Sequence, residues 1–530
     1  MNEHLQNEAR PRWYITTSIP YVNAQPHIGH ALELIQADTL ARYHRLVGNE
    51  VRLQSGADEN ALKNVQAAER EGVTTADLVT RNAERFQALQ ETLTLSLDDF
   101  IRTSAEERHR LGVEQFWRAC AANGDIYRQP YQGLYCVGCE LFYGEDELVE
   151  GRCPIHDTVP ELVEEENYFF RLSRYEEQLA ALIESDRLRI VPETRKNEVL
   201  SFIRGGLRDF SISRSHTRAK DWGIPVPDDP NQVIYVWFDA LVNYITGPGY
   251  ATTGSDYQRF WCDGDQRLHI IGKDITRFHA IYWPAMLLSA GLPLPDTILV
   301  HGFITINGGK VSKSKGNVID PVTLVNTYGT DALRYYLLRK VPTTGDANFT
   351  HDEFVQTYNA DLADQLGNLV QRVVKMVERY CESRVPSPAT LTALDHDLVT
   401  AVERTRTALH VAFDELALHQ AIEAVRRLVV ATNKYVIDVA PWTLAKAAQQ
   451  GDESAHERLA TTLYVLLETL RLIGHLLAPF LPTTATAITL QLGLGGKTSQ
   501  LPWKDTLVWW QLEPGQVLPT AQPLFPKQQG

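Results

Sequence analysis

The hydrophobic pattern of the first sixty residues predicts two strands with a helix between them. Residues 13–20, WYITTSIP, are apolar and β-branched and end at a proline, as expected of a buried strand. Residues 31–46 carry apolar side chains at helical spacing, and Gly48 follows as a C-cap. A second strand is predicted at residues 51–58, VRLQSGAD. A strand, a helix and a strand in this order form a βαβ unit, which indicates a parallel sheet.

The sheet is predicted to resume after a long insertion. Helical sequence follows the second strand to about residue 122, and the character of the chain then changes over residues 125–225. Continuous apolar runs, which are typical of buried parallel strands, return as VIYVWFDAL, LHIIGKDI and TILVHGFITI at residues 233–241, 268–275 and 297–306. We therefore expect one parallel sheet that is split by the segment at 125–225.

The C-terminal part of the chain is predicted to be all-helical. From about residue 355 to 500 one helical pattern follows another with few glycines, as in a helical bundle. The Pro-rich end, TAQPLFPKQQG, is predicted to be irregular. The chain thus divides into five predicted segments: 1–124 and 226–305 as two halves of a sheet domain, 125–225 as an insertion, 306–355 as a connecting segment, and 356–530 as a helical domain with its tail.

Composition and net charge exclude some classes of protein. The 530 residues have 44% hydrophobic and 22% charged content, which is ordinary for a folded soluble protein. The net charge of -15 excludes binding of nucleic acid by a general positive field, although a local basic face for one folded RNA remains compatible with it. The polar N-terminus predicts no signal peptide, and no uncharged apolar run is long enough to predict a membrane span. We therefore expect a cytoplasmic protein.

The turn between the first strand and the first helix is a candidate anion site. It contains the tetrapeptide HIGH, with His27 and His30 predicted in the first turn of the helix. Free backbone N–H groups and the positive end of the helix dipole favour a phosphate there, and Gly29 lets a flat ligand lie close to the backbone. Taken alone, these four residues fit a chance sequence with solvated histidines equally well.

Polar residues follow two of the predicted strands at the edge where open parallel sheets bind ligands. Asp58 and Glu59 follow the second strand, and Gly272 and Asp274 follow the run at 268–271. A helix N-cap is the alternative explanation for the first pair.

An aromatic stripe and a lysine-rich loop have less specific patterns. The stripe consists of residues at helical spacing, namely Trp237, Ala240, Leu241 and Tyr244. On its own this spacing favours a helix face that packs into the core. The loop, INGGKVSKSKGN, contains Lys310, Lys313 and Lys315. Lysines on such a loop can close over a polyphosphate, although in isolation the sequence is more typical of a solvated basic loop.

The spacing of the cysteines predicts a metal site. Three of the six cysteines lie within 18 residues, which indicates a metal site more than disulfides. Cys136 and Cys139 form one close pair, and after thirteen intervening residues Cys153 and His156 form a second. Thiolate and imidazole ligands suit zinc, and a full set of four protein ligands indicates a structural ion.

Together these motifs resemble the class I aminoacyl-tRNA synthetases. HIGH is followed some 280 residues later by KVSKS, across a split sheet and ahead of a helical domain. Among these enzymes the chain resembles the methionine-specific branch over nearly its full length, in SIPYVNAQPHIGH, GADE, YCVGC, CPIH, SISR, WGIPVP, YVWFDALVNY, IGKDITRFH, HGFITINGGKVSKS, DALRYYLLR, LGNLVQR and APWTLAK. One departure is Asn60-Ala61, where the family commonly has His-Gly after the GxDE element.

The resemblance implies an α/β fold, with a Rossmann-like catalytic sheet split by a zinc-bearing insertion and an all-helical anticodon-binding bundle. It implies that methionine is joined to tRNA(Met) through a methionyl-adenylate, with ATP, Mg²⁺ and one structural Zn²⁺. A monomer with one zinc knuckle and no appended C-terminal domain is expected.

The resemblance also implies roles for particular residues. His27, His30, Lys310 and Lys313 would be catalytic. ATP would be held by His27, Gly29, His30, Glu33, Gly272, Asp274, Ile304, Lys310 and Lys313. Methionine would be bound by Ile19, Tyr21, Asp58, Trp237, Ala240, Leu241, Tyr244, Ile275 and His279. Asn368, Arg372 and Trp442 would read the anticodon, and Cys136, Cys139, Cys153 and His156 would bind the metal.

Two alternatives remain. A sister enzyme for isoleucine, valine, leucine or cysteine would have similar motifs, but the branched-chain enzymes usually carry a much larger editing insertion. A non-catalytic RNA-binding paralogue would be expected to have lost histidines or lysines that are present here.

Overall fold

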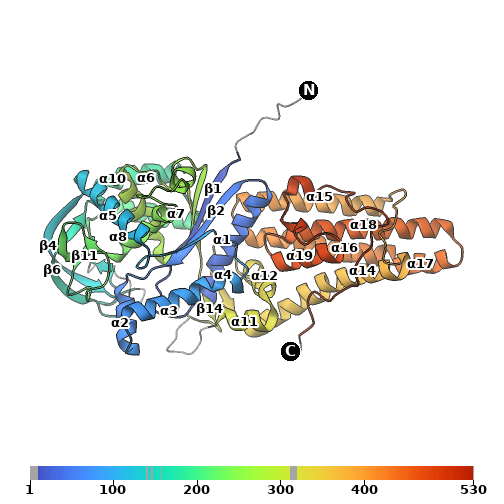
Figure 1. Cartoon of the computed structure of the whole chain (residues 1–530), viewed down its shortest axis with the longest axis horizontal. Coiled ribbons are helices and arrows are strands. Elements are labelled where there is room, and N and C mark those ends of the chain that lie inside the picture. Colours follow the sequence, from blue (N-terminus) through green and yellow to red (C-terminus); the bar gives the residue numbers. More distant parts are fainter. Residues whose placement is uncertain (1–9, 139–140, 145–146, 155–156, 311–318, 529–530) are drawn as a thin grey trace, which may run out of the picture. The chain divides into compact units, whose positions relative to one another are not determined.

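The computed structural model describes residues 10–138, 141–144, 147–154, 157–310 and 319–528. The chain separates into two compact units. The first unit takes residues up to 37 together with 50–90 and 96–301, and the second takes 38–49, 91–95 and the residues from 302 onward. Figure 1 shows the elements of both, and each unit is described by itself.

A six-stranded parallel sheet forms the centre of the first unit. The strand order is β3-β2-β1-β12-β13-β7, and each neighbouring pair is parallel. The middle strands are almost completely buried, which explains their continuous apolar sequence. The strands are β1 (Arg12–Thr17), β2 (Glu50–Ala57), β3 (Asp99–Arg102), β7 (Arg189–Val191), β12 (Gln266–Gly272) and β13 (Thr297–His301).

Helices follow the strands of the first unit, and α1 and α4 continue into residues of the second. The apolar faces of the helices from α5 to α10 share one large core with β1, β12 and β13. The helices are α1 (Ile28–Leu46), α2 (Leu62–Glu71), α3 (Thr75–Gln87), α4 (Leu89–Thr92), α5 (Glu107–Ala122), α6 (Glu176–Glu184), α7 (Glu193–Arg204), α8 (Val236–Leu241), α9 (Asn243–Thr246) and α10 (Trp283–Ala290).

Two small antiparallel sheets complete the first unit. In one, β4 and β6 pair from Ile126 opposite Phe170 to Tyr135 opposite Glu161. Its strands are β4 (Ile126–Cys136), β5 (Leu141–Tyr143), β6 (Glu161–Phe170) and β8 (Phe210–Ser211). The other contains β9 (Ser213–Ser215), β10 (Pro225–Val226) and β11 (Asp229–Ile234).

The structure differs from the predicted elements at four places. The stretch expected to be helical up to residue 122 contains β3. The run VIYVWFDAL is not a parallel strand, because its start belongs to antiparallel β11 and Val236 begins α8. Strand β7, inside the predicted insertion, pairs with β13 in the parallel sheet. Finally, the end of TILVHGFITI forms β14 in a separate sheet of the second unit.

The second unit is mainly the helical bundle expected from the sequence (Figure 1). A small sheet precedes it, formed by β14 (Ile304–Ile306), β15 (Gly309–Lys310) and β16 (Ala347–Phe349). The helices are α11 (Pro321–Tyr328), α12 (Thr330–Lys340), α13 (His351–Thr357), α14 (Asn368–Cys381), α15 (Ala393–Asp414), α16 (Leu418–Val439), α17 (Pro441–Gln449), α18 (Glu453–Leu477), α19 (Pro482–Gln491) and α20 (Trp503–Thr506).

Helix α18 is the central helix of this bundle. It is the one described helix that is long and apolar enough to cross a membrane by length and composition, but 94% of the apolar window is buried inside the protein. Glu468 and Arg471 on this helix form a buried ion pair at 2.7 Å. Glu468 accepts hydrogen bonds from the backbone N–H groups of residues 510–512, and Arg471 donates to the carbonyl of Thr506. This pair therefore fixes the C-terminal segment on the bundle.

Candidate active site at the carboxyl edge of the sheet

The parallel strands bring most candidate residues of the first unit to one edge of the sheet. Ser18 follows β1, Asp58 follows β2, and β12 and β13 end at Gly272 and His301. Ligands bind at this edge in open parallel sheets because the loops that follow the strands meet there.

The two histidines of the HIGH turn lie against each other at the start of α1. Their rings stack with centroids 3.8 Å apart. The backbone N–H of His27 donates to Nδ1 of His30, and the N–H of Gly29 donates to Nδ1 of His27, both at 3.1 Å. A ring nitrogen that accepts carries no hydrogen, so Nε2 is the nitrogen of each ring that can donate to a ligand. The catalytic and ATP-binding roles of His27 and His30 stay predictions. Helix α1 begins at Ile28, so His27 immediately precedes it.

Gly29 has little room for a side chain. A Cβ added there would lie 3.0 Å from Cε1 of the His27 ring, which is tighter than ordinary van der Waals contact. The glycine therefore allows the His27 ring to fold back over the start of the helix.

Glu33 lies one turn further along α1 and is buried. The Ser18 hydroxyl donates to its Oε1 at 2.6 Å, and Oε2 lies 2.8 Å from Nε2 of His301. Neither His301 nor Ser18 was predicted from the sequence as a site residue. His301 could have been predicted, because it is a polar residue at the end of a buried apolar strand.

An aromatic cluster lies beside this edge. The ring of Trp237 stacks on Phe278 at 3.7 Å, and Tyr21 and His279 each approach Trp237 edge-on at 6.3 Å. Trp237 comes from α8, whereas Phe278 and His279 come from the helical segment before α10. The structure thus brings together residues that are more than two hundred positions apart in the sequence.

Tyr244 and His279 form the buried end of this cluster. The Tyr244 hydroxyl lies 2.7 Å from Nε2 of His279, and Nδ1 of His279 lies 3.0 Å from the carbonyl oxygen of Ile275. A carbonyl only accepts, so Nδ1 carries the hydrogen and Nε2 accepts from the tyrosine. Burial lowers the pKa of His279 to about 4 and raises the pKa of Tyr244 well above its usual value. Both groups are therefore uncharged near pH 7.

The remaining predicted residues of the aromatic cluster differ in burial. Ala240 and Leu241 are buried on α8, and Ile19 and Ile275 are partly exposed. A Cβ on Gly56 would lie 2.9 Å from a methyl carbon of Ile19, so Ile19 lies directly above the end of β2. The stripe at helical spacing is thus partly a core face, as the alternative interpretation expected, and partly accessible at Trp237.

Asp58 lies beside Tyr21 at the end of β2. The two residues form an isolated parallel bridge, and Asp58 accepts from the backbone N–H of Asn60 at 3.2 Å. Glu59 has a different environment, because Arg102 and Ser104 bind both of its carboxylate oxygens, at 2.7 and 2.6 Å. Neither residue caps α2, whose N-cap is Ala61, so the N-cap explanation is wrong.

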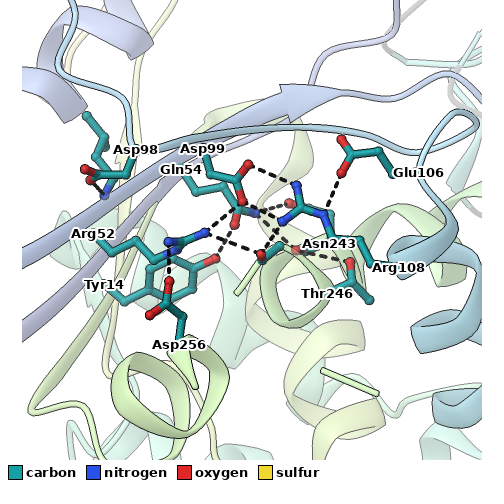
Figure 2. Close-up of polar contacts among 12 residues, drawn as sticks. Tyr14, Arg52, Gln54, Asp98, Asp99, Glu106, Arg108, Asn243, Thr246 and Asp256 are labelled. Carbon is teal, nitrogen blue, oxygen red and sulfur yellow. Dashed lines mark hydrogen bonds and ion pairs between the residues drawn. The ribbon is translucent and has the colours of Figure 1, made fainter. Parts of the chain in front are cut away.

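A polar network behind the aromatic cluster holds the segment at 243–247 in place (Figure 2). Gln54 accepts from the Tyr14 hydroxyl at 2.7 Å and donates to Asn243 at 3.1 Å. Arg108 donates to Asp99 and to the carbonyl of Gly247, at 2.9 and 2.7 Å. A Cβ on Gly247 would lie 1.8 Å from the Gln54 side chain, so only glycine fits at this position. This network fixes the segment that carries Tyr244.

The predicted metal ligands are described only in part. Cys136 ends β4, Cys153 lies in the following loop, and both are buried in one small cluster with Tyr143. Neither cysteine forms a disulfide bond. The described residues form no group of three or more metal-ligating side chains, while Cys139 and His156 lie outside the described residues. Two buried thiols in one cluster fit a structural zinc site whose other two ligands are those residues.

The remaining candidates belong to the second unit. Ile304 is buried in β14, the backbone of Lys310 pairs with Thr305, and Lys313 lies outside the described residues. On α14, Arg372 donates to the side chain of Asn433 at 2.8 Å. Asn368, four residues before Arg372, begins α14 and is exposed. Trp442 is 47% exposed at the start of α17, so it is not a core residue.

Two family models match nearly the whole chain. The model described as tRNA synthetases class I (M) matches residues 13–159 and 145–374. The model described as the anticodon binding domain of methionyl tRNA ligase matches residues 385–529.

Individual relatives and solved structures agree. The methionine–tRNA ligase of Brucella suis is 44% identical over 523 residues, which are 98% of each chain. That of Bacillus subtilis is 41% identical over 97% of this chain and 78% of its own length. The structure of Mycobacterium tuberculosis methionyl-tRNA synthetase in complex with methionyl-adenylate matches 97% of this chain and 100% of its own, with a TM-score of 0.92 and 42% identity. The apo form of that enzyme gives a TM-score of 0.86 at 40% identity, over 98% of this chain and 99% of its own. The chain therefore belongs to the methionine–tRNA ligase family of class I tRNA synthetases.

Proposed function

We propose that this chain carries out the family's ATP-dependent attachment of methionine to tRNA(Met) with the residues at the carboxyl edge of its parallel sheet. The observation that carries the assignment of these residues is the uncharged aromatic cluster around Trp237 and His279 beside the Asp58 carboxylate. A thioether is apolar and polarizable and suits an aromatic site, and a carboxylate suits an α-amino group.

The methionine site is assigned to residues around this cluster. Asp58 binds the amino group, and Tyr21, Trp237 and His279 contact the thioether side chain. The neutral Tyr244–His279 pair places no charge against the sulfur, which favours methionine over charged amino acids. The site is completed by Ile19, Ala240, Leu241, Tyr244 and Ile275.

The ATP site is assigned to the start of α1 and the ends of β12 and β13. The Nε2–H groups of His27 and His30 donate to phosphate oxygens, and Gly29 lets the nucleotide approach the backbone. Glu33, held by Ser18 and His301, together with Gly272 and the exposed Asp274, binds polar atoms of the nucleotide. From the resemblance, Ile304 also contacts ATP, and Lys310 and Lys313 neutralise the leaving pyrophosphate.

The first step joins methionine to AMP. A methionine carboxylate oxygen attacks the α-phosphorus in line, an oxygen–phosphorus bond forms, and the bond to the β-phosphate oxygen breaks. A carboxylate with a pKa near 4 is already ionised at pH 7, so no general base is needed. Positioning and donors that stabilise the charge on the phosphates must therefore supply the catalysis. Magnesium, which binds largely through substrate phosphates, would neutralise the β and γ oxygens.

The second step transfers methionine to tRNA. The terminal ribose hydroxyl of the tRNA attacks the activated carbonyl, an ester forms, the hydroxyl proton is lost and AMP leaves. Asn368, Arg372 and Trp442 are proposed to read the anticodon, by base-edge hydrogen bonds and by stacking on the exposed indole.

Cys136, Cys139, Cys153 and His156 are proposed to hold one structural zinc ion. The ion would stabilise the fold of the loop between β4 and β6, where the described part has little core of its own. A monomeric state and a cytoplasmic location also stay predictions.

ATP–pyrophosphate exchange with a panel of amino acids tests this proposal. Exchange with methionine alone supports it. Exchange with isoleucine, valine, leucine or cysteine would support a sister enzyme, and no exchange with any amino acid would support an RNA-binding paralogue.

A further inference from the structure

The two residues that depart from the family pattern, Asn60 and Ala61, both contact the region of α8. The side-chain amide of Asn60 donates to Oδ2 of Asp239 on α8 at 2.6 Å. Ala61 is fully buried and packs with Tyr235 and Val236, where α8 begins. The turn after β2 is therefore connected to α8 once by a hydrogen bond and once by apolar packing.

Asn60 also contacts Asp58, the residue assigned to the amino group of methionine. Its backbone N–H donates to Oδ1 of Asp58 at 3.2 Å. A single residue thus binds Asp58 through its main chain and Asp239 through its side chain. Trp237, Ala240 and Leu241, assigned to the other end of methionine, lie on α8 within two residues of Asp239.

The other oxygen of Asp239 continues the connection into the core. It lies 2.6 Å from Nε2 of His109 on α5, and Nδ1 of His109 lies 2.8 Å from the Thr246 hydroxyl on α9. Asn60, Asp239, His109 and Thr246 are all buried. A Cβ on Gly112, one turn beyond His109, would lie 2.2 Å from the Thr246 side chain, so α5 and α9 pack without free space. Because this packing holds His109 in place, Asp239 stays bonded to His109 and does not shift when the residue at position 60 is changed.

We infer that Asn60 is a positioning residue that sets the spacing between the two ends of the methionine site, from Asp58 to the face of α8. The inference rests on the proposed function of Asp58 and α8. The buried Asp239 carboxylate needs a donor on each oxygen, and the Asn60 amide is the donor on Oδ2. When it is removed, α8 stays bonded to His109 but the turn that carries Asp58 is no longer held at a fixed distance from α8. Methionine binding therefore weakens, while the ATP residues on α1 and β12 are untouched.

The test compares Asn60→Ala with two matched variants in methionine-dependent ATP–pyrophosphate exchange. Asn60→His restores a ring N–H that can reach Asp239 and is the residue common in the family. Asn123→Ala removes an amide that makes the same kind of bond, at 2.7 Å to Asp125, away from the candidate site. Melting temperatures show which variants are folded.

We expect Asn60→Ala to raise the KM for methionine about tenfold, as the loss of one hydrogen bond to a buried carboxylate implies, with the KM for ATP unchanged. Asn60→His should stay within about threefold of the wild type, and Asn123→Ala should leave both KM values unchanged. In an Asp239→Asn background, which removes the charge, Asn60→Ala should have a smaller effect, because the two residues act through one contact.

An unchanged KM for methionine in Asn60→Ala, or an equal rise in both KM values, would overturn the inference. If Asn60→Ala does not fold, the KM values for methionine of Asn60→Ser and Asn60→His are compared to test the inference. A serine hydroxyl is too short to reach Asp239 and should raise the KM for methionine, and no rise with serine overturns the inference. A wild-type protein without methionine-dependent exchange would instead contradict the proposed function itself.

Discussion

The Tyr244 hydroxyl donates to Nε2 of His279 across 2.7 Å, and the carbonyl of Ile275 fixes the hydrogen of that imidazole on Nδ1. Burial lowers the pKa of the histidine to about 4. A second buried histidine supports this pair: the His269 ring lies 4.1 Å from that of Tyr244 and is hydrogen-bonded by Thr16 and Trp283, at 2.7 and 3.2 Å. The aromatic cluster is thus uncharged and held in one arrangement.

Removing the Tyr244 hydroxyl should weaken methionine activation selectively. Tyr244→Phe leaves Nε2 of His279 buried without its donor, which costs about 1–3 kcal/mol and frees the ring to turn. We expect kcat/KM for methionine to fall at least about tenfold and the KM for ATP to stay constant in pyrophosphate exchange. Tyr464→Phe, which removes a buried hydroxyl bonded to the carbonyl of Leu512 in the bundle, is the control. Equal effects of the two variants would show that the Tyr244 hydroxyl has no specific role.

Stability should decrease between pH 6.5 and 4 because of buried histidines. Burial lowers the pKa of His475 on α18 to about 4, and Arg471 contributes as a nearby charge. Above pH 6.5 the ring is neutral in both the folded and the unfolded chain. As the pH falls toward 4, only the unfolded chain takes up a proton, so the free energy of unfolding should drop by about 2 kcal/mol at pH 5. The melting temperature of the wild type should therefore fall more between pH 7.5 and pH 5 than that of His475→Leu. The same fall in both proteins would show that His475 does not contribute.

Replacing Trp442 should weaken the charging of tRNA(Met) and leave methionine activation unchanged. Stacking of a base on an exposed aromatic ring is worth about 1–3 kcal/mol, so Trp442→Ala should lower kcat/KM for tRNA(Met) tenfold or more. Pyrophosphate exchange without tRNA should keep its wild-type rate. Trp510→Ala is a matched control, because Trp510 is also about half exposed in the second unit, at 45% against 47%. Loss of exchange and charging together in Trp442→Ala would indicate damage to the fold.

The cysteine cluster should bind one zinc ion per chain. Elemental analysis of purified protein should give one equivalent, and Cys136→Ser or Cys153→Ser should reduce it to a small fraction because one of four ligands is lost. Cys262→Ser and Cys381→Ser, outside this cluster, should keep the full equivalent. A wild-type protein without zinc, or one whose zinc survives both substitutions, would contradict the assignment.

Much of the fold was predictable because its buried strands consist mainly of apolar and β-branched residues. β1, β12 and β13 have this signal, and α14 and α16 have a clear helical period of apolar residues. Strand β3 was missed because its sequence, DFIR, is short and half charged, and β7 because RIV is only three residues long. The run at 233–241 was misassigned because its β-branched and aromatic residues are typical of strands. In the structure Asp239 lies on a helix and contacts Asn60 and His109, which are distant in the sequence. The local sequence does not reveal these contacts. The five predicted segment limits stay predictions.

The sequence was enough to predict which residues at the strand ends belong to the candidate site. It was not enough to predict which of them contact one another. Asp58, Gly272 and the HIGH turn follow apolar strands, which was visible in the sequence. The pairing of Glu33 with His301, 268 residues apart, and of Asn60 with Asp239, 179 residues apart, depends on the tertiary fold. The bonds that His27 and His30 accept from backbone N–H groups likewise depend on how the turn folds.

Trapping the reaction intermediate is the most direct test of methionine activation by this chain. The protein is incubated with ATP, magnesium and labelled methionine, separated from free substrates, and then mixed with tRNA(Met). We expect that up to one methionyl-adenylate per chain stays bound and that its methionine moves to the tRNA in one turnover. No bound adenylate with methionine, or an adenylate of a different amino acid, would contradict it.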